Sequence, residues 1–314
     1  MRPINVRVWL NILSALPTAL LFLSGGNAYA QSETRPFQLA LYEYALHPTP
    51  AEADIRTFGA GGPQPPGHGV FIYATINDPL PGPTAYDWSR IDAVFIDEPY
   101  TSFDDGLDLN QCTPPSGTNF QLIQTNLSNR AADLASRNPK ARFWVNFTQR
   151  EASWMQYCAQ GSVFNKTYID VISADYYDEY FNYFLVVFYA YIAAHPATPH
   201  QQTALIPGVF NTQGPYLQSY FDYANTANQT CNLPLGPQGV TGIYDGCPVW
   251  LVMGFLTGDY TDPRNGVTYY GILDGGSGSA PILAAWGAEI ALAPFTTTQQ
   301  KRAAVQPSIL QLLL

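Results

Sequence analysis

Acidic side chains recur in this sequence at the points where predicted β-strands end. The apolar run Ala93–Ile96 leads directly into Asp97 and Glu98, and the run Asp170–Ala174 leads into Asp175. Two neighbouring carboxyl groups can divide the work of glycoside hydrolysis, because one must protonate the leaving group while the other stays ionised. These residues therefore predict acid–base cleavage of a glycosidic bond, provided that the fold brings the strand ends together.

Adjacent residues of a strand point to opposite faces of a sheet, so we expect at most one of Asp97 and Glu98 to face a shared cavity. Val94 and Ile96 share a face with Glu98, which also has the longer side chain of the two acids. We predict Glu98 as the catalytic acid, Asp175 as its carboxylate partner and Asp97 as the reserve. The structural alternative for each acid is to cap a helix or to bond loop amides.

Polar and aromatic residues near the same strand ends are expected to bind the substrate. An aromatic side chain offers a flat apolar face to a sugar ring, and Tyr and Trp add a polar tip. The predicted substrate-binding residues are Tyr42, Glu43, Tyr73, Asn77, Tyr100, Trp144, Asn146, Tyr176 and Tyr177. Glu43 is also a second reserve for the catalytic carboxylate.

Eight short runs predict the strands that position these residues. Most are apolar throughout, which is typical of parallel strands buried on both faces. The predicted strands are Phe37–Tyr44, Val70–Ile76, Ala93–Ile96, Arg142–Phe147, Asp170–Ala174, Ala204–Phe210, Val249–Phe255 and Tyr269–Leu273. Predicted helices are Asn119–Ser136, Asp178–Ala194, Tyr216–Asn225 and Ala280–Ala291, and the Gly- and Pro-rich stretch Gly59–Gly69 predicts a long loop.

Alternation of strands and helices indicates an α/β fold with a parallel sheet. Eight strands favour a single-domain (β/α)8 TIM barrel over an open sheet. In such a barrel the carboxyl ends of all strands meet at one mouth, which is where active sites lie.

The first 30 residues have the pattern of a secretory signal peptide. Arg2 and Arg7 precede an apolar stretch, and Ala28–Ala30 supplies a small-x-small cleavage site. Polar residues interrupt the apolar stretch, which disfavours a membrane anchor. We predict a signal peptide over residues 1–30, a barrel domain over residues 31–314, and secretion without membrane attachment.

The charge balance restricts the expected partners. The chain has 14 Lys and Arg against 24 Asp and Glu, a net charge of −10, and loss of Arg2 and Arg7 with the signal peptide would make it 12 against 24, or −12. Such a surface repels nucleic acid and anionic lipid. A neutral or cationic small substrate, or a neutral polymer, is the better match, and the predicted partner is a polysaccharide or oligosaccharide.

Four cysteines lie in the predicted exported part, at Cys112, Cys158, Cys231 and Cys247. An even number in an oxidising compartment predicts two disulfides. Pairing of sequence neighbours, Cys112 with Cys158 and Cys231 with Cys247, is the simplest of three possible arrangements.

No metal site or cofactor is predicted. The sequence has no C-x-x-C and no H-E-x-x-H motif, and the acids of the segment 104–108 lack the spacing of an EF-hand and indicate a solvated loop. Ser277 lies in Gly275–Ser279, which nearly matches G-x-S-x-G, but no His follows His200 to complete a serine hydrolase triad. The same turn lacks the Lys of a P-loop, so we expect a flexible loop there.

The run Ala93–Glu98 resembles the strand-end Phe-x-Asp-Glu pattern of some TIM-barrel glycoside hydrolases, among them the spherulin-type polygalactosaminidases. The resemblance covers six residues, and those relatives usually have Gly in place of Ala93. It implies a role for Asp97 or Glu98 in polysaccharide cleavage.

Two hypotheses of function follow. The first is a secreted glycoside hydrolase of barrel form that acts on a polysaccharide. The second is a carbohydrate-binding or surface protein without catalysis on the same scaffold. A gap well beyond about 10 Å between the carboxyl groups of Glu98 and Asp175 would favour binding over hydrolysis.

Overall fold

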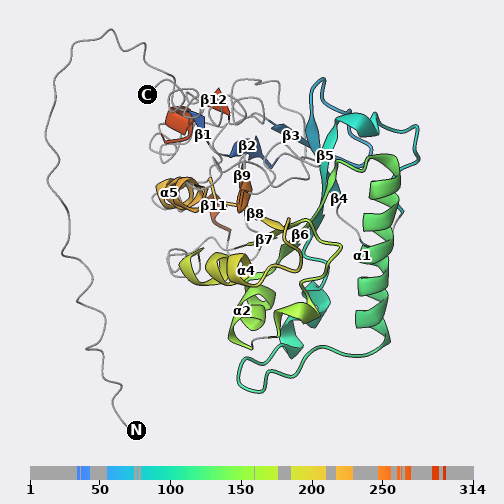
Figure 1. Cartoon of the computed structure of the whole chain (residues 1–314), viewed down its shortest axis with the longest axis vertical. Coiled ribbons are helices and arrows are strands. Elements are labelled where there is room, and N and C mark those ends of the chain that lie inside the picture. The colour runs from blue at the N-terminus through green and yellow to red at the C-terminus, as the bar shows by residue number, and fades with distance from the viewer. Residues whose placement is uncertain are drawn as a thin grey trace, which may run out of the picture. The chain divides into compact units, whose positions relative to one another are not determined.

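The structure is a computed structural model of the chain (Figure 1). It describes residues 34–35, 37–42, 55–73, 76, 79–158, 160–175, 185–209, 217–228, 247–255, 260–261, 263, 266–269, 285–289 and 293–294. The chain divides into two compact units, Met1–Ser32 and Glu33–Leu314, and every described residue belongs to the second. None of the helices in this described part has both the length and the apolar character that crossing a bilayer requires.

Eight parallel strands close into a barrel, which confirms the predicted (β/α)8 TIM barrel fold (Figure 1). They are β2 (Gln38–Leu41), β3 (Ile55–Gly59), β4 (Gly69–Tyr73), β5 (Ile91–Asp97), β6 (Arg142–Phe147), β7 (Val171–Ala174), β8 (Gln202–Leu205) and β9 (Val249–Gly254). Each strand pairs with its neighbour in sequence, and β9 returns to pair with β2. All eight carboxyl ends therefore lie at one end of the barrel.

The predicted strand Tyr269–Leu273 is described only at Tyr269, and residues 270–273 lie outside the described residues. Tyr269 belongs to β11 (Thr268–Tyr269), which pairs antiparallel with β10 (Tyr260–Thr261) outside the barrel. The second barrel strand is instead β3, where Arg56 and Thr57 interrupt the apolar pattern on which the prediction depended. A further two-stranded pairing joins β1 (Thr34–Arg35) in parallel to β12 (Ala293–Pro294).

The apolar strands separate two layers of core. Ala93 and Phe95 of β5 point into the barrel, whereas Val94 and Ile96 pack outward against the helical layer. Inside the barrel the ring of Trp144 meets Phe95 edge-on at 4.6 Å between centroids. Side chains therefore fill the barrel interior, as in other barrels of this size.

Helices cover the outside of the barrel, and α1 (Thr118–Arg137) is the longest of those that the structure describes (Figure 1). It buries Phe120, Leu127 and Leu134, which recur every seven residues on one face. This helix confirms the prediction for Asn119–Ser136. The other helical elements are η1 (Trp88–Arg90), η2 (Thr101–Gly106), α2 (Gln149–Tyr157), η3 (Gly161–Val163), η4 (Leu185–Tyr189), α4 (Ala190–Ala194), α5 (Leu217–Ala227) and a helical segment at 285–289.

The disulfide Cys112–Cys158 links the loop before α1 to the end of α2, as the simplest pairing predicted. Cys247 is disulfide-bonded as well. Its predicted partner, Cys231, lies outside the described residues.

Candidate active site

Three polar side chains meet at the carboxyl ends of β5, β6 and β7. The Nδ2 atom of Asn146 donates hydrogen bonds to Oδ1 of Asp97 at 2.9 Å and to Oδ1 of Asp175 at 2.7 Å. Since both bonds start from one nitrogen, the two carboxylate oxygens are separated by at most the sum of these distances, about 5.6 Å. Asp97, Asn146 and Asp175 thus form one hydrogen-bonded group across three neighbouring strands.

The residues of each strand whose side chains point into the barrel explain why Asp97 and Asn146 lie together. Asp97 continues the inward face of β5 beyond Phe95, and Asn146 follows Trp144 on the inward face of β6. Asp97 and Asn146 are also direct partners in the strand register. Side chains at partnered positions of adjacent strands lie side by side, so the pairing of β5 with β6 places the amide next to the carboxylate.

Glu98 also faces the site, contrary to the expectation that only one of the two adjacent acids would. Val94 and Ile96 face outward, so regular alternation would have turned Glu98 away from the mouth. The strand ends at Asp97, however, and Glu98 has a φ of 40°, in the left-handed region that side chains other than glycine rarely adopt. The turn brings the Glu98 carboxyl group close enough to Asp175 for the two acids to affect each other's titration.

Backbone contacts hold the turn at Glu98. Its N–H donates to the carbonyl oxygen of Asn146 at 3.0 Å, and its own carbonyl accepts from the Thr101 hydroxyl at 2.8 Å. The same hydroxyl lies 3.4 Å from the Glu98 carboxylate. A strained residue that its neighbours hold in this way is characteristic of functional sites.

Burial favours the protonated form of two of these acids. It raises the pKa of Asp97, and hydrogen bonds from Asn146 and Tyr42 oppose that rise. Burial also raises the pKa of Glu98, with the charges of Asp97 and Asp104 acting in the same direction and hydrogen bonds with Thr101 and Asp175 opposing them. Carboxyl groups with raised pKa values retain protons at higher pH and are suited to act as acids.

Tyr42, at the end of β2, lies on the inward face next to Asp97. Its hydroxyl is 3.5 Å from Oδ2 of Asp97, and its ring packs against Phe95 and Phe255 with centroids 5.8 and 5.3 Å away. The Tyr42 side chain is buried, so its ring is not available to stack on a sugar. Its role in the site is the contact between its hydroxyl and the Asp97 carboxylate.

Three aromatic residues that the sequence placed at the mouth belong to the core instead. Tyr73 faces outward beside Phe71, because alternation along β4 turns it away from the interior. Tyr100 is fully buried in the outer layer, where its ring stacks parallel to Phe147 at 6.3 Å. Trp144 points inward but is fully buried beneath the acids. The remaining predicted binding residues, Glu43, Asn77, Tyr176 and Tyr177, lie outside the described residues.

A second pair of acids, Asp104 and Glu151, adjoins Glu98 and was not predicted. Glu151 is fully buried in the first turn of α2, and its carboxylate accepts from the Thr148 N–H at 3.0 Å in a capping box. The Thr148 hydroxyl in turn donates to Asp104 at 3.1 Å. Burial raises the pKa of Glu151 well above its usual range, and the charge of nearby Asp104 acts in the same direction, so the protonated form is favoured. The Thr-x-x-Glu spacing is the sequence signal that would have located this helix start.

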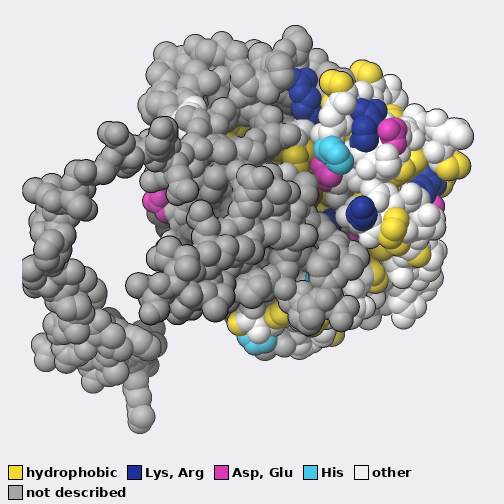
Figure 2. Space-filling view, turned by 45° about the horizontal axis from the view of Figure 1, so that its top comes forward, with side chains coloured by type: hydrophobic (Ala, Val, Ile, Leu, Met, Phe, Trp, Pro, Cys, Tyr) yellow, Lys and Arg dark blue, Asp and Glu magenta, His cyan; other side chains and the backbone are white. Residues whose placement is uncertain are grey.

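Basic and acidic side chains are both present on the face of the described part that Figure 2 shows, and some of them lie next to one another. The ion pairs are His68–Asp92, Arg90–Asp87 and Arg137–Asp133. Within the described residues, neither Asp97 nor Glu98 has a Lys or Arg partner, and no group of three or more His, Cys, Asp or Glu is arranged to hold a metal ion. Burial of these two acids is therefore not offset by a basic group there.

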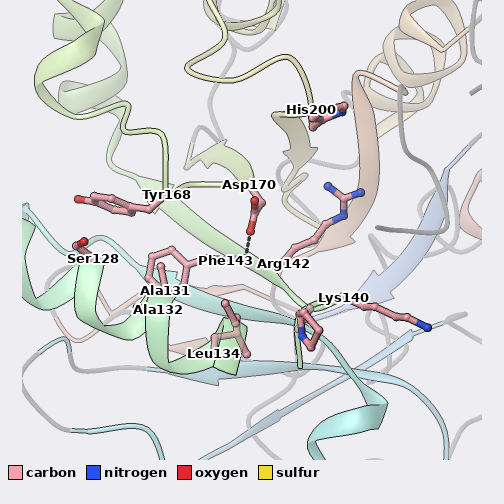
Figure 3. A pocket seen from close by; sticks show the side chains of 13 residues that line it. Ser128, Ala131, Ala132, Leu134, Lys140, Arg142, Phe143, Tyr168, Asp170 and His200 are labelled. Carbon is pink, nitrogen blue, oxygen red and sulfur yellow. Dashed lines mark hydrogen bonds between the residues drawn. The ribbon is translucent and has the colours of Figure 1, made fainter. Parts of the chain in front are cut away.

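A cleft of about 410 Å³ lies at the other end of the barrel (Figure 3). Side chains of α1 and of Lys140–Phe143 line it, together with Tyr168, Asp170 and His200. Asp170 accepts a hydrogen bond from the backbone N–H of Phe143 at 2.7 Å (Figure 3). These residues stand at the amino ends of β6 and β7, whereas the acids stand at the carboxyl ends of the same strands. The cleft is therefore separate from the acidic site.

No protein-family model matches the chain, and no curated protein matches it. A similar solved structure is the D341A D367A calcium binding mutant of Bacteroides uniformis β-glucuronidase 2, with 9% identity and a TM-score of 0.39. The match covers 76% of this chain and 32% of the other, so the chain spans about a third of that protein's length. The fold assignment rests on the closed barrel of the chain itself.

Proposed function

We propose that this protein is a secreted glycoside hydrolase that cleaves a polysaccharide or oligosaccharide by acid–base catalysis. The observation that carries the proposal is the convergence of Asp97, Glu98 and Asp175 at the carboxyl ends of β5 and β7. This is the end of a TIM barrel where catalytic groups lie. Paired carboxyl groups in different protonation states are the machinery that glycoside hydrolysis needs.

Glu98 is the proposed general acid. Burial and the charges of Asp97 and Asp104 raise the pKa of Glu98, which favours its protonated form. Asp175 accepts an N–H from Asn146, which favours its ionised form. Glu98 is partly exposed and has a raised pKa, so it can keep the proton and still reach a substrate.

Asp175 is the proposed nucleophile, with Asp97 as its reserve. Glu98 would donate its proton to the glycosidic oxygen as the bond from that oxygen to the anomeric carbon breaks. The Asp175 carboxylate would form a bond to that carbon, and water, deprotonated by Glu98, would then hydrolyse the glycosyl–enzyme ester and restore both groups. The Asn146 N–H that Asp175 accepts would orient its carboxylate for this attack.

The alternative, a carbohydrate-binding protein without catalysis, has less support. Binding without chemistry would depend on exposed aromatic rings, and among the described residues of the predicted binding set Tyr73, Tyr100 and Trp144 are buried. Asp175 lies close enough to Glu98 to affect its pKa, which is nearer than the gap of about 10 Å beyond which binding is favoured.

A polysaccharide panel tests the proposal. The mature protein is incubated with each polymer, and new reducing ends are measured together with binding by affinity electrophoresis. Release of reducing ends from one polymer class is expected. Binding without any release would support the carbohydrate-binding alternative and overturn hydrolysis.

A further inference from the structure

A chain of hydrogen bonds runs through the barrel interior directly beneath the acids. The indole Nε1 of Trp144 donates to Oγ of Ser173 at 2.7 Å, and Oγ of Ser173 donates to Oδ1 of Asn146 at 2.6 Å. All three side chains have no exposed surface. They stand on the adjacent strands β6 and β7, where Asn146 and Ser173 are register partners.

The chemistry of these groups gives the chain one direction. An indole N–H can only donate, so the Ser173 oxygen is the acceptor of that bond. The Ser173 hydroxyl then has its one proton available, and it donates that proton to Oδ1 of Asn146. A carboxamide oxygen and nitrogen are otherwise easily interchanged, and here the hydroxyl donor on one side and the two carboxylate acceptors on the other favour the same orientation.

In this orientation the amide nitrogen of Asn146 faces Asp97 and Asp175, and each of its two N–H groups can donate to one of these carboxylates. One N–H bonds to Asp97 and the other to Asp175. If the amide were reversed, its oxygen would meet two carboxylate oxygens with no proton between them. The ionised forms of both acids would then be disfavoured.

We propose that Trp144 and Ser173 are positioning residues that hold the Asn146 amide so that it donates one N–H to each of Asp97 and Asp175. The expected effect of Trp144 and Ser173 on turnover rests on the proposed glycosidase function. Their effect on the orientation of the Asn146 amide does not depend on that function. The other ionisable groups near Asp97 are Tyr42 at the end of β2, Glu98 after β5, and Asp175. Asp104 and Glu151 lie near Glu98 and interact with it electrostatically.

The decisive measurement is the titration of the Asp97 carboxyl carbon by ¹³C NMR in the full mature chain, with no substrate present. In Ser173→Ala the amide loses its anchor, and we expect the titration midpoint of Asp97 to move to higher pH. The conservative variant Ser173→Thr keeps the hydroxyl and is expected to titrate as the parent protein does. On a cleaved polymer, Ser173→Ala is expected to lower kcat roughly tenfold with little change in KM, as for a lost hydrogen bond to a charged group.

Thr203→Val is the matched control. The Thr203 hydroxyl is also buried in a barrel strand, but it donates to the Pro248 carbonyl at 2.8 Å near the amino end of β8. Its loss removes one buried hydrogen bond without touching the acids, so the titration of Asp97 should not change.

Trp144→Phe provides a second test that keeps a ring in the interior and removes only the donor. It is expected to shift the Asp97 titration in the same direction by a smaller amount, and it decides the matter alone if Ser173→Ala does not fold. An unchanged Asp97 titration in the folded variants would overturn the positioning role. A shifted titration in a protein that cleaves no polymer would support the positioning role and reject the glycosidase function.

Discussion

Asp97 and Asp175 accept hydrogen bonds from the same nitrogen atom, Nδ2 of Asn146, although 77 positions of the sequence separate them. The strand that carries the amide, β6, lies between the strands that lead to the two acids. Strand pairing in the barrel therefore sets the distance between the carboxylates. A separation of this kind, held by the scaffold rather than by flexible loops, is what a pair of catalytic acids requires.

Replacement of Glu98 by Gln tests the assignment of the general acid. The amide keeps the size of the side chain but has no acidic proton to give, so kcat should fall by about 10²–10⁴-fold. Thermal unfolding should change little, because Glu98 is partly exposed. Asp105→Asn is the control, since Asp105 is an exposed acid on the nearby η2 segment. Full activity in Glu98→Gln would end the assignment.

The short separation of the carboxyl groups predicts retention of anomeric configuration. The oxygens of Asp175, the proposed nucleophile, and of Asp97, its reserve, are at most about 5.6 Å apart, and Glu98, the proposed acid, follows Asp97 directly and lies close enough to Asp175 to share its electrostatic field. Inverting enzymes need roughly 6.5–9.5 Å to admit a water molecule between the two groups. Proton NMR of the first product formed should show the anomer of the substrate. Initial release of the opposite anomer would contradict the proposed nucleophile.

Glu151→Gln is expected to stabilise the protein at neutral pH. The folded state raises the pKa of Glu151 above its ordinary value of 4.5, so the folded protein holds the proton more tightly than the unfolded chain does. The contribution of this group to the free energy of unfolding consequently falls as the pH rises above that value. Gln carries no such proton and preserves the capping box with Thr148.

The measurement is chemical denaturation of both proteins at several pH values. The advantage of Gln over Glu should grow from acidic toward neutral pH. Glu151→Ala serves as the contrasting variant. It loses the capping-box hydrogen bond with Thr148, so its free energy of unfolding should fall by about 0.5–2 kcal/mol. A constant difference between Gln and Glu across the pH range would show that the folded state does not raise the pKa of Glu151.

Removal of the disulfide Cys112–Cys158 should destabilise the fold. The bond closes a loop with a sequence separation of 46 residues that contains α1, β6 and α2. Without the disulfide the unfolded chain gains conformational entropy, and the free energy of unfolding falls by about 4 kcal/mol. The double variant Cys112→Ser, Cys158→Ser should therefore unfold at a lower temperature than the parent protein, and urea titration gives the free-energy difference. Equal stability of the two proteins would contradict this estimate.

The barrel and most of its strands could be predicted from the sequence. Apolar runs such as Arg142–Phe147 are bounded by turn residues and are buried on both faces, so they are recognisable wherever they pair. The same runs show that acids and amides follow at strand ends. The strand β3 was missed because its stability comes from hydrogen bonds to β2 and β4 rather than from its own composition.

Only the tertiary structure decided which side chains share the site. A barrel strand has apolar residues on both faces, so its sequence does not distinguish the inward series of Phe95 from the outward series of Val94. The sequence therefore placed Tyr73 at the mouth, and the barrel turned it outward. The left-handed turn at Glu98 and the shared donor at Asn146 depend on contacts between strands, and such contacts exist only once the barrel has closed.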